Sequence, residues 1–286
     1  MNASRDETDF ARIAQLFEVG KMGDALAMIV GCGSGGGSVA LQLVMSGIKR
    51  FSLFDRDVLK RENVIRHVCG RRYLGQRKVD ALEDVLHDRN PTAVVTKSDA
   101  DLMSLSTLED EVEKATVVVL ATDNEPTRFR LNELCVRRKR PMVVGRVFTR
   151  GIGGDVFAYR PGESGCLACL ERVLERTTYR EGIHEIDLVT QEERDAIYGS
   201  DVTEIKDSPG LNVDISFITS FHTRFVLDAI ARTLRERPKY LAPIDDADCI
   251  IWGNRPVPPF SKHFQLQRVK VHPQTECLVC GTRSAS

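Results

Sequence analysis

The chain of 286 residues is 42% hydrophobic and 28% charged, a globular composition with enough residues for one large domain or two small ones. Its formal net charge of −1 gives no overall field that would attract nucleic acid or an anionic membrane. No apolar stretch approaches the roughly 20 residues of a membrane-spanning helix, and the polar N-terminus is unlike a secretory signal. We therefore expect a cytoplasmic protein without nucleic-acid or membrane partners.

The first half of the chain alternates short apolar runs with amphipathic segments. Strands are predicted at residues 25–30, 51–55, 94–97, 117–121 and 141–147. Helices are predicted at residues 38–46, 77–89 and 125–138. This alternation is typical of a parallel, doubly wound α/β sheet with right-handed crossovers.

The alternation stops after residue 150. Strands are predicted at residues 153–159, 249–253 and 264–271, and a long helix at residues 215–234. Residues 177–207 are charged and weakly periodic, which predicts a long crossover segment. We expect a Rossmann-like fold whose parallel N-terminal half continues into mixed or antiparallel strands.

A glycine-rich turn follows the first predicted strand. Gly31, Gly33 and Gly36 fit the pattern G-x-G-x-x-G at a strand-to-helix junction, and Gly35 lies within it. Missing side chains let backbone N–H groups and a helix N-terminus meet phosphate oxygens. Asp55 ends the second strand, where a ribose-binding acid is expected. These features fit a dinucleotide and ATP equally well.

Polar side chains downstream of the turn favour ATP. Acid, amide and cationic side chains follow one another at Asp57, Asn63, Arg66, Gln76 and Lys78. Asp123 follows the strand at 117–121, at the carboxyl end where open α/β sheets bind ligands. A triphosphate needs cations and Mg²⁺, and a nicotinamide cofactor needs neither.

Four of the eight cysteines form two Cys-x-x-Cys pairs, Cys166 with Cys169 and Cys277 with Cys280. Zinc prefers four soft ligands in a tetrahedron, and the spacing within each pair suits it. A four-sulfur site would be structural and would tie distant segments together. Disulfides or a redox pair are the alternatives.

In this order, the segments resemble the ThiF/MoeB and ubiquitin-activating (E1-like) superfamily, closest to bacterial stand-alone ThiF members. The resemblance spans about residues 10–281. It rests on the glycine turn, residues 55–57, 63–66, 75–78 and 122–124, and both cysteine pairs.

The resemblance implies ATP-dependent adenylation of the C-terminal glycine carboxylate of a ubiquitin-like (β-grasp) or sulfur-carrier protein. Asp55 would hold the ribose hydroxyls, and Asp123 would hold Mg²⁺. Asn63, Arg66 and Lys78 would hold the phosphates, with Asp57 and Gln76 completing the nucleotide site. Zn²⁺ would be structural.

The resemblance also implies a homodimer, in which an N-terminal arginine reaches the ATP of the partner subunit. Arg12 is the candidate and Arg5 the alternative. Residues 1–24 would be an N-terminal arm. Residues 25–286 would be one adenylation domain, with a nucleotide half at 25–150 and a tail-binding and zinc half at 151–286.

Residues 170–248 contain no cysteine, unlike thioester-forming relatives. We therefore expect no thioester on the crossover segment, and transfer of the activated tail to a conjugating or sulfurtransferase protein. The cysteines outside the pairs, Cys32, Cys69, Cys135 and Cys249, are expected to be packing residues. His67 is expected at the surface or in a loop. Adenylation of a short peptide and a non-catalytic E1-like scaffold remain as alternatives.

Overall fold

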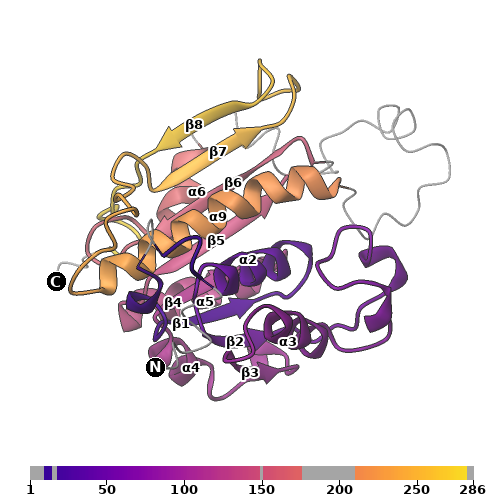
Figure 1. The fold of residues 1–286 in the computed structure, drawn as a ribbon. Helices are drawn as coiled ribbons and strands as arrows, with labels where there is room; N and C mark the ends of the chain where they lie inside the picture. Colours follow the sequence, from indigo (N-terminus) through magenta and orange to yellow (C-terminus); the bar gives the residue numbers. More distant parts are fainter. Residues whose placement is uncertain (1–9, 15–17, 149–150, 176–209, 282–286) are drawn as a thin grey trace.

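A single eight-stranded sheet forms the centre of the computed structural model, in the order β3-β2-β1-β4-β5-β6-β7-β8 (Figure 1). The structure describes residues 10–14, 18–148, 151–175 and 210–281. Arg5 and the predicted crossover segment at 177–207 lie outside the described residues.

Five strands run parallel to one another. They are β1 (Leu26–Val30), β2 (Arg50–Phe54), β3 (Val94–Ser98), β4 (Val117–Leu120) and β5 (Met142–Val147). Every residue of β4 is buried, as expected for a central strand covered on both faces. The carboxyl ends of β1, β2, β4 and β5 therefore meet at one edge of the sheet.

The remaining strands pair antiparallel, each with its neighbour. They are β6 (Gly153–Tyr159), β7 (Cys249–Gly253) and β8 (Gln265–Val269). The predicted change from parallel to antiparallel pairing after residue 150 is confirmed.

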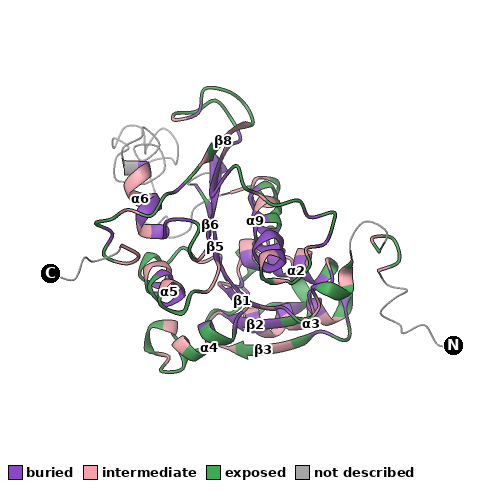
Figure 2. Ribbon diagram, turned by 90° about the vertical axis from the view of Figure 1, so that its left-hand side faces the viewer, coloured by how far each residue is buried: buried purple, intermediate pink, exposed green. Residues whose placement is uncertain are grey.

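Helices cover both faces of the sheet (Figure 2). One hydrophobic core joins the sheet to α2 (Ser34–Met45), α3 (Lys78–Arg89) and α9 (Asn212–Thr233). A second core joins the opposite face to α4 (Leu108–Lys114), α5 (Glu125–Arg138) and α6 (Leu167–Glu175). Single 3₁₀ turns lie at Val19–Lys21, Arg61–Asn63, Arg71–Tyr73 and Leu102–Ser104.

Two short helices were not predicted, and two helices, α2 and α9, begin earlier than predicted, α9 at Asn212 rather than residue 215. The seven residues of α4 are mostly acidic and carry only a weak apolar pattern, and α6 begins inside the first cysteine pair. Helix α2 begins at Ser34 rather than residue 38, because the glycine turn itself forms the first helical turn. None of the described helices combines the length and the apolar character needed to cross a bilayer.

Candidate active site

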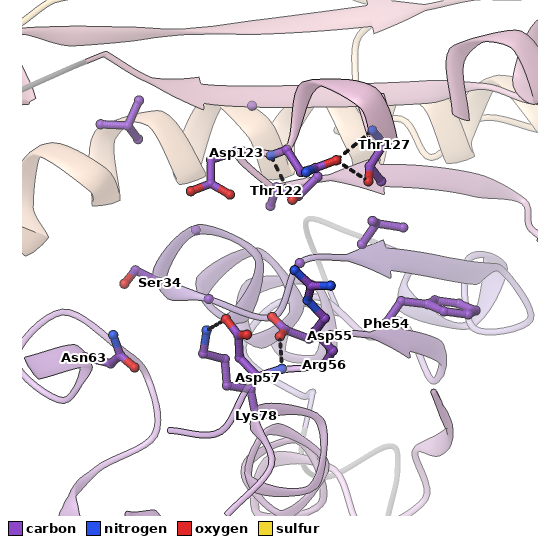
Figure 3. A pocket seen from close by; sticks show the side chains of 18 of the residues that line it. Ser34, Phe54, Asp55, Arg56, Asp57, Asn63, Lys78, Thr122, Asp123 and Thr127 are labelled. Carbon is purple, nitrogen blue, oxygen red and sulfur yellow. Dashed lines mark hydrogen bonds and ion pairs between the residues drawn. The ribbon is translucent and has the colours of Figure 1, made fainter. Parts of the chain in front are cut away.

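A cleft of about 720 Å³ opens at the carboxyl ends of β1, β2, β4 and β5. Most of the predicted site residues line it, namely Gly31, Gly33, Gly35, Asp55, Asp57, Asn63, Arg66, Lys78 and Asp123. Asp123 and Thr122 lie on one wall, across from Asp55, Asp57 and Lys78 (Figure 3). Parallel strands thus bring together residues that are far apart in the sequence.

The glycine turn brings the start of α2 against the end of β1. Gly31 has a φ of +89°, and a Cβ there would lie 2.8 Å from the carbonyl oxygen of Ala121. A Cβ on Gly36 would lie 1.8 Å from the carbonyl oxygen of Gly31. Gly36 is buried and does not line the cleft. It therefore allows close helix–strand packing, while Gly31, Gly33 and Gly35 leave the cleft wall open.

Gly36→Ala should destabilise the fold strongly. The added methyl group meets a backbone atom that cannot rotate away, so we expect a loss of about 3 kcal/mol or more in the free energy of unfolding. Gly35→Ala, in the same turn, meets only Ala121 Cβ at 3.9 Å and should be neutral or slightly stabilising. Urea unfolding of both variants makes the comparison, and equal stabilities would contradict the packing role of Gly36.

Asp55 organises the loop after β2. One carboxylate oxygen accepts the backbone N–H of Cys32 at 2.7 Å, and the other accepts the backbone N–H of Asp57 at 2.9 Å. These bonds hold the carboxylate beside the glycine turn, at the position expected for a ribose-binding acid.

Lys78, at the start of α3, is held by Asp57. Its Nζ lies 2.7 Å from Asp57 Oδ2, and its side chain is 12% exposed. The hydrogen bond from Lys78 lowers the pKa of Asp57, although burial opposes this shift. The pair aims one partly buried cation at the cleft, where a phosphate can compete with Asp57 for it.

The other predicted residues of the cleft are held by their own loops. Asn63 Oδ1 accepts the backbone N–H of Lys60 at 3.0 Å, which leaves its amide nitrogen for other partners. The carbonyl of Arg66 accepts Asn212 Nδ2 at 2.9 Å, which joins this loop to α9. Asn124 caps α5 through the backbone N–H of Thr127 and so fixes the segment that presents Asp123, an exposed carboxylate.

Besides Gly36, the predicted residues Gln76 and Arg12 do not line this cleft. Gln76 is exposed, and its backbone pairs with the loop at Leu59 and Tyr73. Arg12 is exposed in an N-terminal turn. Its predicted role across a dimer stays a prediction.

His67 lies in a loop, as one of its two predicted locations had it, but it is buried rather than at the surface. The ring is 8% exposed and lines the cleft. Its Nδ1 accepts the backbone N–H of Cys69 at 3.0 Å, so Nε2 carries the proton that bonds the carbonyl of Cys32 at 2.7 Å. Burial lowers the pKa of His67. The neutral ring therefore holds the glycine turn in place through its hydrogen bond to the carbonyl of Cys32.

Two cleft arginines were missed. Arg146 in β5 is buried and pairs with Asp155 at 2.7 Å and with Glu171 at 2.5 Å. Although burial opposes the charge, these two carboxylates raise the pKa of Arg146. Arg128 donates its Nε to the carbonyl of Thr122 at 2.8 Å. A charged residue inside the apolar run at 142–147 was the available signal, since arginine is almost never buried without partners.

His222 of α9 was also missed. It is buried, and its Nε2 lies 3.1 Å from the carbonyl of Val143, while the ring fills the space beside Gly145. Burial lowers the pKa of His222 to about 4. Gly145, Ile215, Ile218 and His222 line the same cleft.

Acid should destabilise the fold through His222. In the unfolded chain the His222 imidazole has a pKa near 6.5. Below that pH the unfolded state therefore binds a proton that the folded state does not bind until the pH is much lower. Stability should fall between about pH 6.5 and pH 4, by a total of about 3 kcal/mol from this residue. Denaturant unfolding at several pH values should show a shallower fall in His222→Asn than in the control His272→Asn, which changes an exposed ring. If the stabilities of the two variants fell in parallel with pH, His222 would not be the source of the acid sensitivity.

The cysteines outside the pairs are buried, as predicted. Burial raises the pKa of Cys69 to about 12 and also raises the pKa of Cys32, Cys135 and Cys249. None of these thiols is poised as a thiolate at neutral pH.

The two cysteine pairs meet on the face opposite α2 and α9. The four Sγ atoms lie within 4.8 Å of one another, with Cys166 and Cys277 at 3.6 Å and Cys169 and Cys280 at 3.4 Å. Sulfur atoms of a tetrahedral zinc site lie about 3.8 Å apart, given Zn–S bonds of about 2.3 Å. The cluster therefore can hold a metal ion such as zinc.

The family model of the ThiF family matches residues 10–231. The chain belongs to the ThiF family. Its glycine turn, its cleft at the carboxyl ends of the parallel strands and its four-cysteine cluster are thus features of a ThiF-family chain.

Among curated relatives, the chain is 33% identical over 174 residues to "Adenylyltransferase and sulfurtransferase MOCS3" of Sus scrofa. This match covers 58% of the chain and 38% of that protein. The chain is also 31% identical over 151 residues to "Adenylyltransferase and sulfurtransferase MOCS3-1" of Zea mays. That match covers 52% of the chain and 32% of the Zea mays protein. The matches thus span only about a third of these relatives.

Solved structures show the same fold. "Crystal structure of E. coli MccB" superposes with a TM-score of 0.71 and 20% identity, covering 99% of this chain and 74% of that one. The predicted Rossmann-like fold of this family is confirmed.

Proposed function

We propose that this chain uses ATP to adenylate the C-terminal glycine carboxylate of a ubiquitin-like or sulfur-carrier protein. The observation that carries the proposal is the cleft. It sets the cations of Lys78 and Arg66 beside the Asp55 loop and faces them with the exposed carboxylate of Asp123. The ThiF-family match and the adenylyltransferase names of its relatives support the same chemistry.

In the proposed complex, Asp55 holds the ribose hydroxyls and the glycine turn meets the phosphates. Asn63, Arg66 and Lys78 offset the phosphate charge. Asp123 would hold Mg²⁺, which would supply positive charge to offset that of the phosphates. Zn²⁺ in the cysteine cluster would act only on structure, because four sulfur ligands leave no open position.

The reaction needs no general base. A C-terminal carboxyl group has a pKa near 3.5, so at neutral pH it is already a nucleophile. One carboxylate oxygen bonds to the α-phosphorus while the bond to the bridging β-phosphate oxygen breaks, giving an acyl-adenylate and pyrophosphate. The barrier comes from repulsion between anions, so positioning and charge neutralisation supply the catalysis.

The acyl donor would lie in the part of the cleft that α9 lines. The His222 ring fills the space beside Gly145 of β5, and Ile215 and Ile218 of α9 add apolar side chains to the lining of the cleft. An extended tail that ends in small residues such as glycine would fit there. Transfer of the activated tail to a conjugating or sulfurtransferase protein, and a homodimer that brings Arg12 to a partner's ATP, complete the proposal.

A second candidate function is the adenylation of a short peptide. It is favoured by the fold shared with E. coli MccB, one structure of which is a complex with N-formylated MccA. A third, a non-catalytic scaffold, is disfavoured by the joint presence of Arg66, Lys78 and Asp123 in one cleft.

ATP–pyrophosphate exchange separates these functions. Exchange that depends on a β-grasp protein with a C-terminal glycine supports the proposal. Exchange with a free peptide alone supports the second candidate. ATP binding without exchange by either substrate supports the scaffold. A reducible adduct of the tail on this chain would contradict adenylation without a thioester.

A further inference from the structure

A second cavity, of about 420 Å³, lies at the opposite edge of the sheet from the cleft. It opens to solvent and is lined by residues just before β4 and β5, residues just after β6, and the C-terminal end of α9. Helix α9 lines both cavities, with Ile215 and His222 at the cleft and Ala229 and Thr233 here.

The lining of this second cavity is strongly basic. It carries five cations, Lys114, Lys139, Arg140, Arg160 and Arg232, and one carboxylate, Glu163. Three of the cations have carboxylate partners: Lys114 has Glu111, Arg160 has Asp228 and Asp248, and Arg232 has Glu163, Asp228 and Asp245.

The remaining two cations, Lys139 and Arg140, are different. Within the part of the chain that the structure describes, neither side chain has a hydrogen-bond or ion-pair partner, and Lys139 is exposed whereas Arg140 is half-buried. The Nε of Arg140 is shielded from solvent and donates to no acceptor, and the same holds for the Nε of Arg160, a residue only 4% exposed. Buried donors of charged groups normally have an acceptor, so these donors are suited to bind an ion or a water.

Helix dipoles account for only part of this arrangement. The C-terminal ends of α4, α5 and α9 line the cavity, and cations are favoured at such ends. A cation placed for that purpose alone would donate to the helix carbonyls. Arg140 donates only its backbone N–H, to the carbonyl of Cys135. Its guanidinium group is therefore left for a ligand.

We propose that this cavity binds a phosphate-bearing small molecule, with Arg140 and Lys139 as its principal contacts. Guanidinium groups match the geometry of phosphate oxygens, and a volume of about 420 Å³ exceeds what a single water or chloride would fill. The hydroxyl of Thr116, which accepts the backbone N–H of Leu26 at 3.0 Å, keeps its proton available for the same anion.

Calorimetric titration of the full chain with inorganic pyrophosphate at fixed ionic strength tests this proposal. The titrations use the Lys78→Ala background, so that binding in the first cleft contributes little. Adding Arg140→Gln should weaken the remaining binding about tenfold or more, and Lys139→Gln should weaken it to a lesser degree. The matched control is Arg137→Gln, which alters an exposed arginine of the same helix end paired with Glu109, and it should leave the affinity unchanged.

The proposal would be overturned if Arg140→Gln, Arg137→Gln and the Lys78→Ala background all bound pyrophosphate with equal affinity. It would also be overturned if Arg140→Gln and Arg137→Gln lost pyrophosphate affinity to the same extent. Thermal melting without ligand should give equal melting temperatures for Arg140→Gln and its background, so a loss of affinity cannot come from unfolding. If Arg140→Gln changed the sedimentation coefficient and left pyrophosphate affinity intact, a carboxylate of a second copy would occupy the cavity, and the proposal would be wrong.

Discussion

Lys78→Ala should slow ATP–pyrophosphate exchange by about 10²- to 10³-fold, the usual loss when one charge-stabilising donor is removed from an active site. Lys78 Nζ is the partly buried cation beside the Asp55 loop, and in the described structure only Asp57 neutralises it. Asp123→Ala should cause a loss of similar order, because it removes the carboxylate expected to hold Mg²⁺.

Lys97→Ala is the matched control for Lys78→Ala. Lys97 is also a lysine held by carboxylates, Asp80 and Glu83, but it lies outside the cleft. Its removal should leave exchange within about twofold of the parent, as expected for an exposed ion pair. Exchange that survives Lys78→Ala and Asp123→Ala at the parental rate would remove the cleft as the site of reaction.

Cys277→Ser should remove most of the bound zinc and destabilise the chain by about 4 kcal/mol. The metal would tie Cys166 to Cys277, residues separated by 111 positions, and closing so long a loop restricts the unfolded chain strongly. The metal would also anchor α6, whose Leu167, Leu170 and Leu174 belong to the core on that face. Zinc analysis together with thermal melting provides the measurement.

Cys135→Ala separates metal binding from packing. Cys135 is buried in α5 and takes no part in the cluster, so its truncation should lower stability by about 1 kcal/mol and leave the zinc content unchanged. Loss of stability on adding a reductant, with no effect of a metal chelator, would instead indicate disulfides and would contradict the metal site.

Periodicity and strand ends allowed most of the parallel half to be predicted. Asp55 and Asp123 each follow an apolar strand, and the carboxyl ends of parallel strands meet at one edge, so their approach could be expected before any coordinates. The change to antiparallel pairing was predicted because the alternation of strand and helix stops after residue 150.

Contacts between distant segments could not be predicted in the same way. The bond of His67 to Cys32 depends on how a loop folds beneath the glycine turn. The approach of His222 to Val143 depends on α9 packing against β5, across 79 positions of sequence. No local pattern encodes such pairs, because their energy comes from burial after the sheet has formed.

The fate of the α-phosphate tests the central claim most directly. The full chain is incubated with Mg²⁺, a β-grasp protein ending in glycine, and ATP labelled at either the α- or the γ-phosphate. The account predicts that the α-label appears on the protein tail as an acyl-adenylate and that the γ-label leaves as pyrophosphate. Release of the γ-label as inorganic phosphate, with ADP as the other product, would contradict it.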